Sequence, residues 1–182
     1  MLDYVEAQAV EDISKLKHLA ELMKEKMPAI LASKEGLKVA CALFNLLEAK
    51  DRKSVVKSLP CAEMAVNRIA HLFVIHVANN LDDTQLTKKK VLHDVLMKID
   101  DQIDDFNFQN VLNSALMPLE TETKNGVLQY KCNSYLTQED LSCMSLFLDK
   151  STSKKDRKIR SVELFKIVQK PLSMFFEEKL SF

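Results

Sequence analysis

One block of sequence occurs three times along this chain. It reads GLKVACAL from Gly36, AHLFVIHV from Ala70 and FQNVLNSA from Phe108, at steps of 34 and 38 residues. Repeats of this length are typical of two- or three-helix units that stack into a solenoid. The end of the unit repeats too, because residues 53–59 resemble residues 90–96. A stack of this kind leaves a long surface free and indicates a protein that binds an extended partner.

The composition predicts an all-α fold. The chain has only two glycines and four prolines in 182 residues, against usual frequencies of about 7% and 5%. Few places remain for turns that need positive φ, and charged residues alternate with apolar ones at helical spacing. Hydrophobic residues make up 47% of the chain, which is enough for a continuous core.

Helical periodicity divides the chain into segments. Residues 2–9 read as the end of a helix whose beginning is missing, as if a longer array had been cut. We expect residues 1–80 to hold helical repeats, the first truncated, and residues 81–182 to hold the last repeat and a continuous C-terminal extension. Residues 120–134 are weakly patterned and predict an exposed loop, with 127–130 as an extended stretch. Helices are expected over 12–23, 29–33, 35–48, 51–59, 66–79, 86–99, 103–117, 141–148 and 155–179, the last kinked or interrupted at Pro171.

The formal net charge is zero, but the charges are segregated. Basic runs lie at 50–57, 88–90 and 154–160, and acidic residues cluster at 82–83 and 100–105. One basic run is usually a solvated face, whereas three on one surface would indicate phosphate binding. The acidic cluster is explained as a complement to a helix dipole, so we expect neither a metal nor a cofactor.

Catalytic, redox and membrane motifs are not found in the sequence. There is no glycine-rich phosphate loop, nucleophile elbow or H-E-x-x-H, so we expect no enzyme and no small-molecule substrate. His71 and His76 are five residues apart, diverge on a helix and are not expected to share a metal. No signal peptide or membrane span is recognised, so we expect no membrane partner. The four cysteines lack C-x-x-C spacing and are expected to be reduced thiols: Cys41, Cys61, Cys132 and Cys143.

Further segments, together with the repeated block, carry a family resemblance. They are AKDRK at 49–53, NLDDT at 80–84, YLTQEDL at 135–141 and SKKDRKIR at 153–160. In order and spacing they resemble the Puf-A/Penguin subfamily of Pumilio (PUF) repeat proteins, and the last two resemble its C-terminal CPL extension. The resemblance touches nearly the whole chain. It implies a right-handed, armadillo-like α-solenoid of three-helix repeats with a C-terminal helical extension.

The resemblance also implies a function. The family role is RNA binding in the nucleus and nucleolus during large ribosomal subunit maturation and rRNA processing, with translation regulation as a related role. The implied partners are RNA (rRNA or mRNA), DNA and ribosome-assembly proteins. PUF proteins that read sequence use two or three side chains of each middle helix for one base. Those positions here are Leu37, Lys38 and Cys41, then His71, Leu72 and Ile75, then Gln109, Asn110 and Asn113.

Most of these residues lack the amide, carboxylate or flat cation that reads or stacks on a base. We therefore expect noncatalytic RNA binding without base-specific readout, through contacts with the phosphate backbone. Zero net charge leaves an alternative, in which the chain is a protein-interaction scaffold that docks a ribosome-assembly partner. The candidate RNA-binding residues are Lys34, Lys38, Lys50, Arg52, Lys53, Arg68, His71, Lys88, Lys89, Lys90, Gln109 and Asn110.

Overall fold

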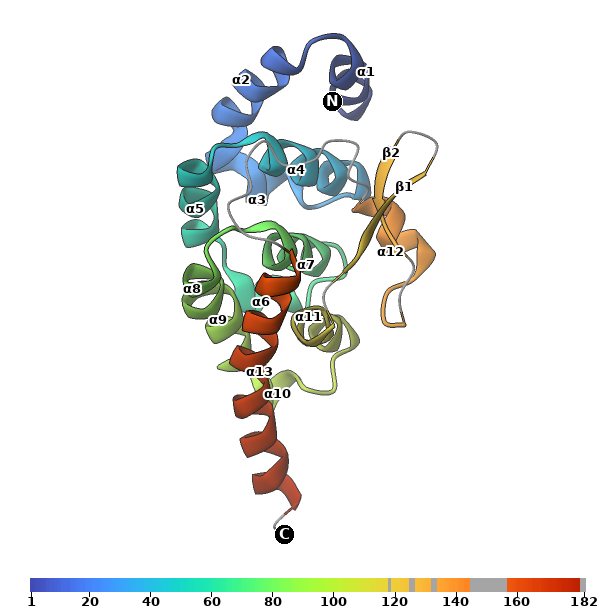
Figure 1. Ribbon diagram of the computed structural model, residues 1–182. Coiled ribbons are helices and arrows are strands. Elements are labelled where there is room, and N and C mark those ends of the chain that lie inside the picture. Colours follow the sequence, from blue (N-terminus) through green and yellow to red (C-terminus); the bar gives the residue numbers. More distant parts are fainter. Residues whose placement is uncertain (118, 125–126, 132–133, 145–156, 181–182) are drawn as a thin grey trace.

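Three successive helical units form the body of the protein. The computed structural model describes residues 1–117, 119–124, 127–131, 134–144 and 157–180 (Figure 1). Two N-terminal helices, α1 (Leu2–Glu11) and α2 (Ile13–Met23), precede the first complete unit. The first unit contains η1 (Lys24–Lys26), α3 (Met27–Ile30), α4 (Lys34–Leu46) and α5 (Ala49–Ser58). The second contains α6 (Cys61–Ala65), α7 (Ala70–Asn80), α8 (Thr84–Leu86), the π-helical segment η2 (Thr87–Leu92) and α9 (His93–Leu96). The third begins with α10 (Ile99–Gln102) and α11 (Phe106–Leu116).

The middle helices α4, α7 and α11 stack side by side. Their N-cap residues are Ser33, Ile69 and Asp105, spaced 36 residues apart. α7 packs against α4 on one side and α11 on the other. Its residues from Ala70 to Ala78 are all buried, which explains why this helix is apolar on every face. The stacked units confirm the predicted α-solenoid.

A glycine lets the first middle helix start close to the preceding one. The Ser33 hydroxyl accepts a hydrogen bond from the Gly36 amide at 3.0 Å and caps α4. A Cβ atom at Gly36 would lie 1.8 Å from the Ile30 carbonyl oxygen, which belongs to the backbone. The close approach of α3 to α4 therefore requires glycine at this position.

The C-terminal extension contains the exception to the all-α prediction. Strands β1 (Thr121–Lys124) and β2 (Val127–Tyr130) form an antiparallel hairpin that pairs Thr121 with Tyr130. Only the stretch 127–130 was expected to be extended. The hairpin is followed by α12 (Gln138–Cys143), which starts with a capping box of Thr137 and Asp140 and packs against α4 and β2.

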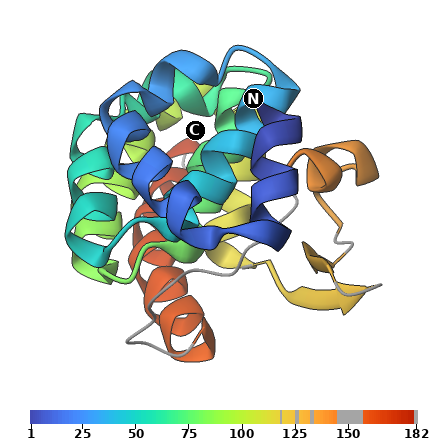
Figure 2. The ribbon, with the colours of Figure 1, turned by 90° about the horizontal axis from the view of Figure 1, so that it is seen from above.

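Helix α13 (Arg157–Leu180) closes the stack at its C-terminal end. It packs against α11 and also touches α8 and η2. Seen from two directions, α5, α8 and α9 lie on the side of the molecule opposite the hairpin and α12 (Figures 1 and 2). We call α5, α8, η2, α9 and α13 the outer row, and the side of the middle helices that faces α12 the inner face.

Some predicted helix boundaries are wrong. The expected helix over 86–99 is divided among α8, η2 and α9, and that over 103–117 begins only at Phe106, after the Asp105 cap. The helix predicted over 155–179 is not interrupted at Pro171, which lies inside α13. Residues 145–148 of the predicted helix 141–148 lie outside the described residues. The predicted division at residue 80 falls between α7 and α8 and stays a prediction.

Among the described residues, no helix combines the length and the apolar character that a bilayer span requires.

Candidate functional site

The base-reading positions of the middle helices are mostly buried. Leu37, Cys41 and Ile75 have no exposed surface, and Leu72 has almost none. Burial also raises the pKa of the Cys41 thiol well above its usual range. These side chains cannot contact a base in this structure, which supports the expectation that bases are not read.

A buried polar chain joins the middle helices to the hairpin. The Asn80 amide donates to the Tyr130 hydroxyl at 2.7 Å, and Tyr130 lies 3.1 Å from His76 Nδ1. The opposite ring atom, His76 Nε2, lies 3.1 Å from Asn45 Oδ1. All bonds are satisfied by a neutral imidazole that donates to Asn45 and accepts from Tyr130. The hairpin is thus fixed to α4 and α7 by polar contacts at its Tyr130 end.

Three of the candidate residues meet at the inner face. Lys34, Arg68 and His71 line a cavity of about 250 Å³ together with residues of α12. Lys34 forms an ion pair with Glu139, and this hydrogen bond raises the pKa of the lysine. Because Glu139 occupies Lys34 and Asp140 also lines the cavity, the positive potential at this face is reduced.

The His71 side chain is buried and contacts the backbone four residues earlier in the chain. Its Nδ1 atom lies 2.9 Å from the Asn67 carbonyl oxygen, and burial lowers the pKa of the imidazole. Asn110 is also buried, at 1% exposure. Gln109 is exposed on α11 and donates to the Ile103 carbonyl oxygen at 2.8 Å, away from the Lys34 cavity. Lys38 is half-buried.

Arg52 joins two successive units. Its side chain is completely buried, and Nη2 lies 2.8 Å from Asp82 Oδ2. Nη1 donates to the carbonyl oxygens of Leu47 and Asn45. The neighbouring Lys53 pairs with Asp83 at 2.8 Å, and this hydrogen bond lowers the pKa of Asp83. Arg52, His71 and Asn110 are buried, so these three predicted residues are not available at the surface for contact with RNA.

Exposed lysines gather on the outer row. α5 contacts η2, and α13 contacts both α8 and η2, so these basic elements are neighbours. Lys90 is occupied, because it pairs with Asp94 at 2.8 Å. Six exposed lysines of these elements have no ion pair within the described residues, and we call them the outer-row lysines: Lys50 and Lys57 of α5, Lys88 and Lys89 of η2, and Lys166 and Lys170 of α13.

Sequence reasoning missed Lys57, Lys166 and Lys170 as individual sites. The first lies inside the repeated block 53–59 and seven residues after Lys50, so it shares a helix face with that candidate. The last two are four residues apart, which also places them on one face of a helix. This spacing was available in the sequence, but the packing of α13 beside η2 was not.

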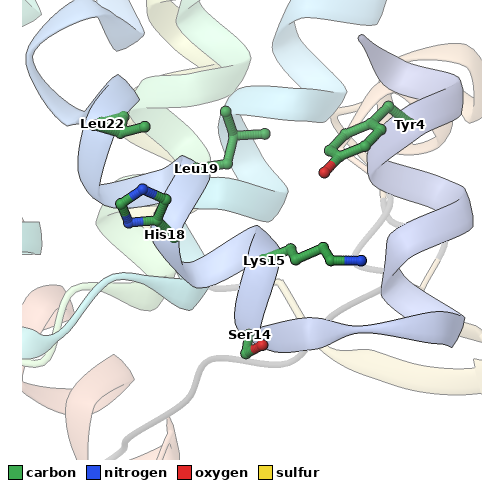
Figure 3. A pocket seen from close by; sticks show the side chains of 6 residues that line it. All are labelled: Tyr4, Ser14, Lys15, His18, Leu19 and Leu22. Carbon is green, nitrogen blue, oxygen red and sulfur yellow. The ribbon is translucent and has the colours of Figure 1, made fainter.

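A pocket lies at the N-terminal end of the stack. It lies between α1 and α2, and Lys15 extends from α2 toward α1, which carries Tyr4 (Figure 3).

No group of three or more His, Cys, Asp or Glu side chains that could hold a metal is found in the described part of the chain. Cys41, Cys61 and Cys143 are buried free thiols; Cys132 lies outside the described residues.

The fold and its covered inner face define an α-helical repeat protein with a hairpin-and-helix extension. No protein-family model matches the sequence. Penguin of Drosophila melanogaster is 32% identical over 93 residues, which is 50% of this chain and 12% of that protein. Pumilio homology domain family member 6 of Schizosaccharomyces pombe is 38% identical over 80 residues, 43% of this chain and 12% of that protein. Its namesake from Saccharomyces cerevisiae is 26% identical over 166 residues, 90% of this chain and 23% of that protein.

Solved structures show the same fold. Human Puf-A superposes with a TM-score of 0.81 at 20% identity, over 99% of this chain and 34% of that one. Human Puf-A in complex with DNA superposes with a TM-score of 0.76 at 20% identity, over 90% of this chain and 30% of that one. These similarities support an assignment to the Puf-A/Penguin subfamily of Pumilio-repeat proteins. The chain spans under a quarter of the length of Penguin and of the two yeast Pumilio homology proteins.

Proposed function

We propose that this chain is a noncatalytic RNA-binding repeat protein that contacts phosphates through the outer-row lysines and does not read bases. The observation that supports this most strongly is the contrast between the two faces. Six of the nine base-reading positions are buried, whereas lysines that form no ion pair within the described residues lie on neighbouring helices of the outer row.

The lysines are suited to a phosphate backbone and not to base edges. A lysine ammonium is a compact, hydrated point charge with no planar fork for a base edge or for stacking. Phosphate contacts position a protein on nucleic acid but carry no sequence information. The arginine in the basic run of α5, Arg52, is occupied by Asp82 inside the fold. The outer row therefore favours binding that tolerates any sequence.

The relatives support nucleic acid as the ligand. Human Puf-A is known in a complex with DNA, and by analogy we extend nucleic-acid binding to this chain, with RNA as its principal ligand and DNA as a ligand it tolerates. Following the family role, we place its action in the nucleolus, during large ribosomal subunit maturation. Ribosome-assembly proteins are the proposed protein partners.

The test is the salt dependence of RNA binding. Affinity for a single-stranded RNA of about 20 mixed-sequence nucleotides is measured by fluorescence anisotropy between about 50 and 200 mM KCl. Each phosphate contact to single-stranded RNA contributes about 0.7 to the slope of log affinity against log salt. The double variant Lys88→Gln/Lys89→Gln should weaken binding and lower that slope by about 1.4.

Two matched variants separate the faces. Lys17→Gln/Lys98→Gln removes the same charge from exposed lysines outside the outer row and should leave the slope unchanged. Lys38→Gln/Arg68→Gln removes it from the inner side, near α12. No binding at the lowest salt, or a slope that falls only for the inner-side variant, would contradict the proposal.

A further inference from the structure

A groove lies at the C-terminal end of the repeat stack, between α11 and the last turns of α13. Its volume is about 410 Å³. Leu112 and Leu116 line it from α11 together with the polar Gln109 and Asn113, and Leu172 and Phe176 form the apolar wall on α13. Figure 1 shows that α13 extends beyond α10 toward the C-terminus, so its last turns project from the body.

The upper part of the groove exposes apolar surface to water. Leu112 and Leu172 are buried at its base, but the Phe176 side chain is 50% exposed. Met117, which follows Leu116 at the end of α11, is 51% exposed. Covering this surface would bury apolar area that the fold itself leaves in contact with water.

Carboxylates lie in the groove and near it in sequence. Asp104 lines it and has no hydrogen bond or ion pair within the described residues, whereas the next residue, Asp105, caps α11 at 2.9 Å from the Phe108 amide. Asp104 is therefore not needed for capping. Further exposed carboxylates are close to the lining residues in sequence: Asp100 and Asp101 on α10, and Glu177 next to Phe176 on α13.

We propose that this end groove binds an amphipathic helix of a partner protein, with leucine-like residues on one face and lysine or arginine on the other. The two facing helices offer the apolar trough that helix-in-groove recognition uses. The carboxylates complement a basic helix and repel nucleic acid. A second copy of this chain would oppose carboxylates to carboxylates, so the groove is not self-complementary. The groove is apolar and acidic, so it is a separate site from the basic outer-row lysines.

The test uses a synthetic peptide and its charge-reversed counterpart. The peptide is about 16 residues long, or about 24 Å as a helix, with leucines at every third or fourth position and lysines elsewhere. In the counterpart, glutamates replace all lysines. Fluorescence anisotropy of the labelled peptides should show that the chain binds the lysine peptide at least about tenfold more tightly than the glutamate peptide.

Variants locate the binding site. Phe176→Gln should weaken binding of the lysine peptide by about tenfold, and Asp101→Asn/Asp104→Asn by about fivefold. Met174→Gln is the matched apolar control, since Met174 is 59% exposed on the same helix but two residues away, toward the opposite face. Glu25→Gln/Glu63→Gln is the matched charge control, on exposed carboxylates of η1 and α6. Both controls should change the affinity less than twofold.

Other outcomes would overturn the proposal. Equal binding of both peptides, or equal weakening by groove and control variants, would show that the groove has no specificity for a basic helix. Loss of RNA binding in Phe176→Gln would identify RNA as the occupant. A dimer in sedimentation that becomes monomeric in Phe176→Gln would identify a second copy. The Asp101→Asn/Asp104→Asn variant changes only surface residues, so it keeps the test valid if Phe176→Gln fails to fold.

Discussion

Arg52 and Asp82 form an ion pair between the first and second repeat units, at 2.8 Å between Nη2 and Oδ2. The arginine is fully buried, and its Nη1 atom donates to two backbone carbonyls at the end of α4. One side chain thus fixes the loop after one middle helix to the loop after the next. This contact is a structural determinant of how the units stack.

Removing one partner of this pair should destabilise the fold strongly. Asp82→Ala leaves a buried guanidinium without its carboxylate, which costs about 3 to 5 kcal/mol in comparable sites. We expect the free energy of unfolding in urea to fall by about that amount. Lys53→Ala breaks the neighbouring pair with Asp83, whose lysine side chain is 43% exposed, and should cost less than about 1 kcal/mol. Equal effects of the two changes would contradict a structural role for Arg52.

The Tyr130 hydroxyl should stabilise the hairpin against the repeats. Tyr130→Phe leaves Asn80 without one acceptor and His76 Nδ1 without its donor, and both residues are buried. Unsatisfied buried polar groups cost about 1 to 3 kcal/mol. Urea denaturation should show this loss, while Tyr4→Phe, at a side chain that is 48% exposed, should leave stability unchanged. An unchanged midpoint for Tyr130→Phe would show that the polar chain contributes nothing.

Gly36→Ala should be destabilising although alanine normally favours helices. The added methyl group would meet the Ile30 carbonyl, a backbone atom that cannot move without displacing α3. We expect a loss of about 1 to 3 kcal/mol in the free energy of unfolding, typical of overpacking. The control Ser54→Ala, on the exposed side of α5, should stay within about 0.5 kcal/mol of the parent chain. A more stable Gly36→Ala variant would contradict the close approach of α3 to α4.

The buried thiols should make stability fall at alkaline pH. Burial raises the pKa of Cys61 from its ordinary value of 9.0 to about 12. Between these values the unfolded chain releases a thiol proton that the folded chain keeps, so unfolding becomes more favourable as pH rises. The free energy of unfolding should drop by about 1.4 kcal/mol per pH unit for this thiol. Cys61→Ala should lose that part of the slope, and identical slopes for the two chains would be inconsistent with a buried, protonated thiol.

The sequence predicted the repeats because each middle helix carries its own apolar pattern, as from Ala70 to Ala78. It did not predict the break inside 86–99 or the pairing of β1 with β2, since propensity does not specify a π-helical segment and pairing depends on contacts far apart in the sequence. Arg52 was predicted to be an exposed RNA-binding residue because it lies in the basic run 50–57. Its partner Asp82 lies 30 residues away, and only the stacking of units brings the two together.

The candidate site was predicted only in part, because the sequence shows basic runs but not ion pairs between residues that are far apart in the chain. Lys50, Lys88 and Lys89 are exposed, as their positions in basic runs suggested. Lys34 forms an ion pair with Glu139, and Lys90 forms one with Asp94. The first of these pairs is long-range and could not be found from spacing, whereas Lys90 and Asp94 are four residues apart on the chain.

Lysine footprinting tests the central proposal most directly. Exposed lysines are acetylated with a limiting reagent, with and without single-stranded RNA, and the modified positions are quantified by mass spectrometry. We predict that RNA protects the outer-row lysines, Lys50, Lys57, Lys88, Lys89, Lys166 and Lys170, and leaves Lys38 and Lys98 unchanged. Protection of Lys38 with full reactivity of Lys88 and Lys89 would contradict this account, because it would place the RNA on the inner face.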